Sequence, residues 1–96
     1  MSLKILISQP NLYDSKVFMP LVFLCLKTYV DKQEDIQPVT WLDPLFRTTD
    51  VDTMLKGINL KQLDILGLSC YDWNWQLNLQ IAKRVKQENP NCLVIA

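Results

Sequence analysis

Three short runs of almost continuous apolar residues constrain the fold of this chain more than any other feature. They are LKILIS at residues 3–8, ILGLSC at residues 65–70 and CLVIA at residues 92–96. Runs of this length without polar alternation are typical of strands that are buried on both faces of a sheet. Because helical patterns separate the runs, we expect the strands to be parallel and joined by crossover helices.

Three segments carry these helical patterns. Residues 20–32 begin with a proline, which suits the first helical turn, and are apolar nearly all round, which predicts a largely covered helix. Residues 50–59 form a short amphipathic pattern that either Thr49 or Asp50 can cap. Residues 74–88 repeat large apolar side chains at four-residue spacing, and the following Asn-Pro pair ends the pattern.

A fourth strand is predicted at residues 36–42, and Pro38 puts it at a sheet edge because proline cannot donate a ladder hydrogen bond. The alternation of strands and helices predicts one α/β domain over residues 1–96 with three layers, α/β/α. Its parallel sheet of four strands takes the order 2-1-3-4, which is flavodoxin-like or Rossmann-like. Since the chain ends in its last strand, we expect the sheet to be incomplete at its C-terminal edge and the chain to be truncated.

Composition excludes several classes of function. Ten basic and ten acidic side chains balance each other and leave no basic field for nucleic acid. The longest apolar run, residues 17–26, is too short for the roughly 20 residues of a membrane span. There is no histidine, and the three cysteines are too widely spaced for a metal clip or a disulfide framework. We therefore expect a cytoplasmic protein with no catalytic residue and no metal ligand of its own.

The stretch DILGLSCYDWN, followed by LQIAKRVKQENPNCLVIA, resembles the N-terminal cobalamin-binding-type domain of cobalamin-dependent radical S-adenosylmethionine enzymes. In that family an apolar-Gly-apolar-Ser strand leads through an aromatic loop into a helix with a basic Asn-Pro tail. The resemblance implies a module that holds cobalamin and is not catalytic by itself. It also implies a parent enzyme, for example a methyltransferase, whose S-adenosylmethionine and [4Fe-4S] cluster bind in a downstream radical domain absent here.

In a sheet of order 2-1-3-4, ligands bind beyond the carboxyl ends of the first and third strands. The two loops expected there offer flat aromatic groups and polar groups, which suit a corrin plate fringed with amides. The candidate cofactor-binding residues are Gln9, Asn11, Tyr13, Ser69, Cys70, Tyr71, Asp72 and Trp73. Other interpretations stay open, since Trp73 also fits a stripe that fills the top of the core, and Asp72 or Asn74 fits a helix cap.

Trp75 and Leu79 fall on the side of their helix roughly opposite the stripe of Ile81 and Val85. An exposed apolar pair often marks an interface, although a lone tolerated surface aromatic is the alternative. We expect this pair to contact the absent radical domain or a second copy of the chain. The alternative function is a receiver-like protein-docking domain with no cofactor.

Overall fold

The computed structural model describes residues 2–10, 21–47, 49–71 and 73–96. In chain order the elements are β1 (Leu3–Ser8), α1 (Leu21–Asp31), β2 (Val39–Trp41), α2 (Val51–Leu55), the 3-10 helix η1 (Leu60–Gln62), β3 (Ile65–Leu68), α3 (Trp75–Glu88) and β4 (Leu93–Ile95). The strands form one sheet in the order β2-β1-β3-β4, and each neighbouring pair is parallel. The α/β class and the strand order predicted from the sequence are confirmed.

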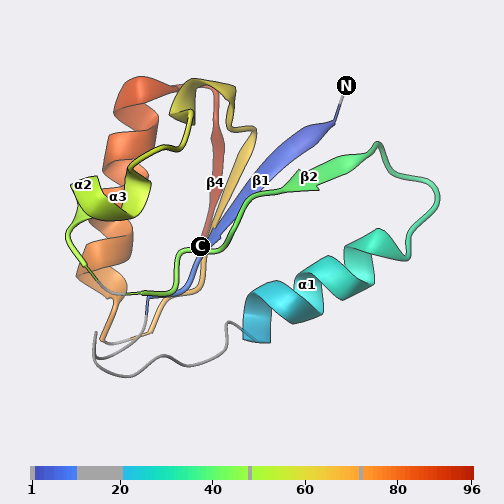
Figure 1. Cartoon of the computed structure of the whole chain (residues 1–96), viewed down its shortest axis with the longest axis horizontal. Helices are drawn as coiled ribbons and strands as arrows, with labels where there is room; N and C mark the ends of the chain where they lie inside the picture. Colours follow the sequence, from blue (N-terminus) through green and yellow to red (C-terminus); the bar gives the residue numbers. More distant parts are fainter. Residues whose placement is uncertain (1, 11–20, 48, 72) are drawn as a thin grey trace.

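Helices cover both faces of this sheet (Figure 1). On one face α2 and α3 pack against the side chains of Leu6 and Leu66, and the buried Ile81 and Val85 of α3 complete this larger core. On the other face α1 contributes Phe23 to a smaller cluster built on the isoleucines of β1. The alternation of side chains along a strand explains the two clusters, because consecutive residues of β1 point to opposite faces.

The helix α1 is much less covered than its apolar sequence predicts, so that prediction is wrong. Phe23 is buried, with its ring at 5.8 Å from the ring of Trp41 in an edge-to-face arrangement, but Leu24, Leu26 and Tyr29 are exposed. The cause is its position, since α1 packs on the sheet through the small cluster around Phe23 and leaves Leu24, Leu26 and Tyr29 to solvent. No helix within the described ranges, α1 included, combines the length and apolarity that a bilayer span requires.

The two edge strands are short. The strand predicted at residues 36–42 lies at the expected edge but spans only Val39–Trp41. Pro38 stops it from starting earlier, because it has no N–H and joins the sheet only through its carbonyl, which accepts a hydrogen bond from Leu3 N at 2.9 Å. At the opposite edge, β4 has Leu93 and Ile95 about half exposed.

Asp50 is the residue that caps α2. Its carboxylate accepts hydrogen bonds from the hydroxyl of Thr53 at 2.7 Å and from Thr53 N at 3.1 Å. These two bonds, the hydroxyl bond first, hold the pKa of Asp50 below its ordinary value. Because the folded-state pKa is lowered, the cap stabilises the fold above the unfolded-state pKa of about 3.9 and loses this effect as the pH falls through the folded-state value.

We therefore expect Asp50→Ala to lower the melting temperature at pH 7, and the difference from the wild type to shrink as the pH falls below about 3.9. Thermal unfolding followed by circular dichroism across this pH range measures the effect. Thr49→Ala is the control, because within the part of the chain that the structure describes the Thr49 hydroxyl makes a long 3.4 Å bond to the neighbouring Asp50 carbonyl and none to the helix. A difference that is constant with pH would contradict the assignment of the cap.

Candidate functional site

The strands β1 and β3 lie side by side in the middle of the sheet, and their carboxyl ends lie at the same end of the sheet. Their parallel register runs from Ile5 beside Ile65 to Ser8 beside Leu68. Beyond the last pair, Ser69 N donates a hydrogen bond to Ser8 O at 2.9 Å, which continues the ladder into the loop. The loops after β1 and β3 therefore leave the sheet together, at the end where α3 begins (Figure 1). This confirms the topology on which the predicted crevice depends.

The loop after β2 lies along the other flank of β1. Leu45 N donates to Ile7 O at 2.9 Å, and Gln9 N donates to Leu45 O at 2.7 Å. The end of β1 is thus held between the chain around Leu45 and the chain around Ser69. The segments that follow β1, β2 and β3 therefore meet at the carboxyl end of the sheet.

Tyr71 and Trp73 form a flat aromatic surface at this edge, called here the aromatic stack. Their rings are nearly parallel, with an interplanar angle of 3° and a centroid distance of 4.5 Å. Trp73 Nε1 donates to Pro10 O at 3.3 Å, which ties the stack to the loop after β1. Trp73 is 51% exposed and lies before the start of α3, so the interpretation that it fills the top of the core is wrong.

The other candidate residues differ in burial and in hydrogen bonding. Ser69 and Cys70 are half-buried, and Cys70 Sγ accepts a hydrogen bond from Asn78 Nδ2 at 3.6 Å. Gln9 Oε1 is buried and has no hydrogen-bond partner among the described residues. Asn11, Tyr13 and Asp72 lie outside the described residues.

An apolar groove of about 250 Å³ lies beside the same strand ends, on the face of the sheet that carries α1. Its lining includes Ile7, Gly67, Ser69 and Ile95. A Cβ atom at Gly67 would approach Ile7 Cδ1 to 2.8 Å, which is closer than side chains normally pack. Glycine at this position therefore lets β1 and β3 keep their close side-chain packing beside the groove.

Sequence reasoning missed a pair of buried carboxamides beneath the loops. Asn74 and Asn78 are 1% and 0% exposed, and both contact the backbone of the loop after β3. The predicted cap role of Asn74 is only half right, because it occupies the N-cap position of α3 but its side chain makes no capping bond. The signal was present in the spacing, since Asn74 and Asn78 continue the buried stripe of Ile81 and Val85 by whole helical turns.

Trp75 and Leu79 are 48% and 46% exposed on α3. Leu79 also borders an apolar groove of about 470 Å³ that runs between α3 and Val94 of β4. The exposure that the sequence predicted is present, and the partner expected there stays a prediction.

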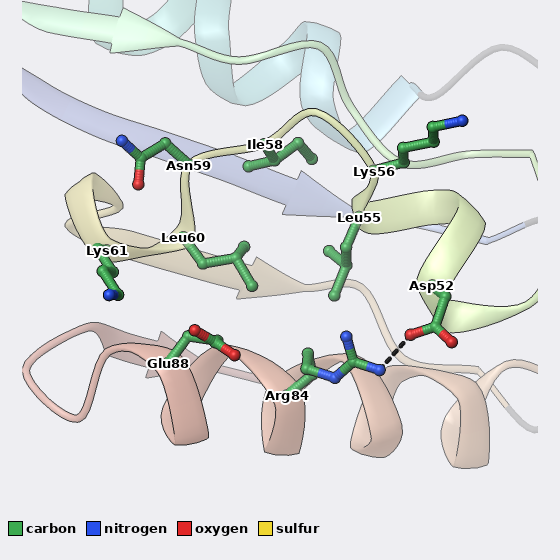
Figure 2. Close-up of a pocket in the computed structure, with 9 residues that line it drawn as sticks. All are labelled: Asp52, Leu55, Lys56, Ile58, Asn59, Leu60, Lys61, Arg84 and Glu88. Atoms are coloured by element: carbon green, nitrogen blue, oxygen red, sulfur yellow. Dashed lines mark hydrogen bonds and ion pairs between the residues drawn. The ribbon is translucent and has the colours of Figure 1, made fainter.

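A third groove, of about 400 Å³, lies between the turn after α2 and the C-terminal half of α3 (Figure 2). Arg84 of α3 forms an ion pair with Asp52 of α2 at one end of it, and Lys61 and Glu88 lie toward the other end. Of the candidate cofactor-binding residues that the structure describes, none lines this groove. It is therefore separate from the described part of the loops that carry the aromatic stack.

No family model matches the chain. It is 40% identical over 80 residues to the cobalamin-dependent radical SAM methyltransferase TokK of Streptomyces tokunonensis. It is 35% identical over 80 residues to the 2-(S-pantetheinyl)-carbapenam-3-carboxylate methyltransferase of Streptantibioticus cattleyicolor. Each alignment covers 82% of this chain, and the chain spans only 12% of the length of each relative. The resemblance to cobalamin-dependent radical SAM enzymes found in the sequence is confirmed.

Proposed function

We propose that this chain, which is homologous to part of the cobalamin-dependent radical SAM methyltransferases, is a module that holds the cobalamin of such an enzyme. The homology supports the cofactor class, and the parallel pairing of β1 with β3, which brings their outgoing loops together, supports the place of binding. The single observation that carries the proposal is the solvent-accessible aromatic stack at the edge where a doubly wound sheet binds its ligands.

The residues at this edge fit the chemistry of a corrinoid, which is a broad apolar plate with amide groups around its rim. Tyr71 and Trp73 offer flat apolar area for the plate. Among the described residues Gln9 Oε1 is a buried acceptor without a donor, and an amide N–H of the rim is the kind of group that would satisfy it. Ser69 and Cys70 add polar atoms beside the stack. Asn11, Tyr13 and Asp72 are proposed as further contacts from the sequence alone.

In this proposal the cofactor supplies the methyl-transfer chemistry, and the protein supplies binding and orientation. The chain itself holds the plate against the stack and keeps the end of β1 rigid beneath it. S-adenosylmethionine, an iron–sulfur cluster and the methyl acceptor belong to the proposed whole enzyme, which we place in the cytoplasm. Its radical domain, or a second copy of the chain, is the proposed partner of Trp75 and Leu79.

Titration of the 96-residue chain with hydroxocobalamin tests the proposal. We expect a saturable shift of the visible spectrum, and we expect Trp73→Ala to weaken binding by about tenfold through the loss of flat contact area. Tyr29→Ala is the matched control, because Tyr29 is a 67% exposed aromatic on α1, remote from the stack in the chain. An unchanged cofactor spectrum in the presence of natively folded chain would contradict the proposal.

That contrary outcome would favour the second candidate function, a receiver-like domain that docks a protein and holds no cofactor. The exposure of Trp75 and Leu79 is the observation in its favour. The first strand ends in Ser8 and Gln9, whereas phosphorylation of a receiver requires an acidic cluster at this position. In this alternative the domain therefore docks a protein partner and is not itself phosphorylated.

A further inference from the structure

Three buried polar side chains, Ser8, Asn74 and Asn78, lie beneath the loops after β1 and β3, and none of them is more than 1% exposed. Ser8 ends β1, Asn74 is the N-cap residue of α3, and Asn78 follows one turn later. Polar groups are costly to bury unless hydrogen bonds replace those that water would make. Their position directly under the loops therefore calls for a reason beyond filling space.

Asn78 joins the end of β1 to the loop after β3. Its Oδ1 accepts a hydrogen bond from the Ser8 hydroxyl at 2.8 Å. Its Nδ2 donates to Ser69 O at 3.1 Å and to Cys70 Sγ at 3.6 Å. Every polar atom of this carboxamide is thus used, and the bonds run between two loops that are about 60 residues apart in the chain.

Asn74 reaches further into the same loops. Its Oδ1 accepts from Tyr71 N at 2.7 Å, which fixes the backbone of one member of the aromatic stack. Its Nδ2 donates to Ser69 O at 2.9 Å and to Pro10 O at 3.2 Å. Pro10 O is also the acceptor of the Trp73 indole N–H. One carboxamide therefore binds the backbone of the loop after β1 and of the loop after β3, and it shares the Pro10 carbonyl with the Trp73 indole.

We propose that Asn74 and Asn78 are positioning residues that hold the Tyr71–Trp73 stack in the orientation that receives the flat cofactor. This inference rests on the proposed function for the identity of the ligand. The hydrogen bonds explain why carboxamides occupy these positions. Only a group that donates and accepts at once satisfies the Tyr71 N–H together with the carbonyls of Pro10 and Ser69. An apolar residue of the same size at position 74 would leave the Tyr71 N–H unpaired and would remove one of the two donors to each of the Pro10 and Ser69 carbonyls.

Asn74→Asp separates positioning from folding. Aspartate has the same shape and keeps the acceptor for Tyr71 N, but it cannot donate to Pro10 O or Ser69 O. A carboxylate in this 1% exposed site faces two carbonyl oxygens, so Asn74→Asp is interpreted only where its far-ultraviolet spectrum shows a native fold. Asn74→Ser, which is neutral and smaller and also loses the amide donor, is the second variant. Asn59→Asp is the matched control, because Asn59 is exposed and its side chain makes no capping bond at the start of η1.

The first measurement needs no cofactor. Near-ultraviolet circular dichroism reports the fixed geometry of aromatic rings, and the component lost in Tyr71→Leu identifies the signal of the stack. We expect Asn74→Asp to lose most of that component while its far-ultraviolet spectrum stays native, and Asn59→Asp to retain it. An unchanged stack signal in both Asn74 variants would overturn the proposal.

The second measurement is the affinity for hydroxocobalamin at a temperature where each variant is fully folded. We expect Asn74→Asp to bind about tenfold more weakly than the wild type, and Asn59→Asp to bind equally well. Equal affinity in Asn74→Asp and the wild type would overturn the positioning role. If the wild type itself does not bind, the proposed function fails, and the dichroism still decides whether the carboxamides orient the stack.

Discussion

Leu66→Ala should lower the free energy of unfolding by about 2–5 kcal/mol, the largest effect that we expect of a single substitution in this chain. Leu66 lies in the central strand β3, is 0% exposed and belongs to the larger core cluster. The loss combines the removed apolar contacts with the cavity that remains. Because small domains are stabilised by only about 5–15 kcal/mol, this substitution removes a large share of the total.

Urea unfolding followed by far-ultraviolet circular dichroism measures this difference. Leu93→Ala is the matched control, since Leu93 is a leucine in the adjacent strand β4 but is 55% exposed. We expect the control to change the free energy of unfolding by less than about 0.5 kcal/mol. Similar losses in both variants would contradict the assignment of the core to the face that α2 and α3 cover.

Asn89→Ala should cost about 1–3 kcal/mol, because its side chain satisfies several backbone groups at once. Asn89 Nδ2 contacts the carbonyl oxygens of Leu60, Lys61 and Leu63 at 3.0, 3.2 and 2.8 Å. Asn89 Oδ1 accepts a hydrogen bond from Asn91 N at 3.1 Å. The substitution leaves the carbonyls of η1 without this donor and loosens the connection between the end of α3 and the segment that leads into β3.

Asn59→Ala is the comparison for this second variant, because Asn59 is an exposed asparagine next to the same 3-10 helix and makes no capping bond with its side chain. Thermal unfolding of the two variants and the wild type under one set of conditions measures the contrast. We expect a clear loss in melting temperature for Asn89→Ala and almost none for Asn59→Ala. Equal melting temperatures for both variants would show that the contacts of Asn89 contribute nothing to stability.

Local patterns predict most of the sheet because burial on both faces leaves a direct mark on the sequence. The apolar runs at residues 3–8 and 65–70 contain β1 and β3, and the alternation with helical segments predicts a parallel sheet. The order 2-1-3-4 was adopted from the flavodoxin-like arrangement, and it is confirmed. The edges are predicted less well. β2 is shorter than residues 36–42, and apolar α1 is largely exposed, because how far a neighbour covers an element depends on tertiary packing.

The meeting of the loops after β1 and β3 could be predicted from topology, but the burial and contacts of their side chains could not. Four-residue spacing put Trp73 on the core stripe, whereas α3 begins at Trp75 and leaves Trp73 half exposed against Tyr71. Helix boundaries are uncertain by a residue or two in sequence, and that error moves a side chain from the core to the surface. Asn74 and Asn78 were missed as a pair because polar residues in a helix are usually solvated, and only three-dimensional contacts reveal what they bind.

The pairing of β1 with β3 also determines when this domain can fold during synthesis. Ile5 pairs with Ile65, so the first strand emerges from the ribosome long before its central neighbour is made. Until then the nascent chain exposes an apolar strand flank that a chaperone could shield. Such distant pairing delays closure of the chain, so the end of the sheet that carries the aromatic stack and the middle of the sheet should form together, late and in one cooperative event.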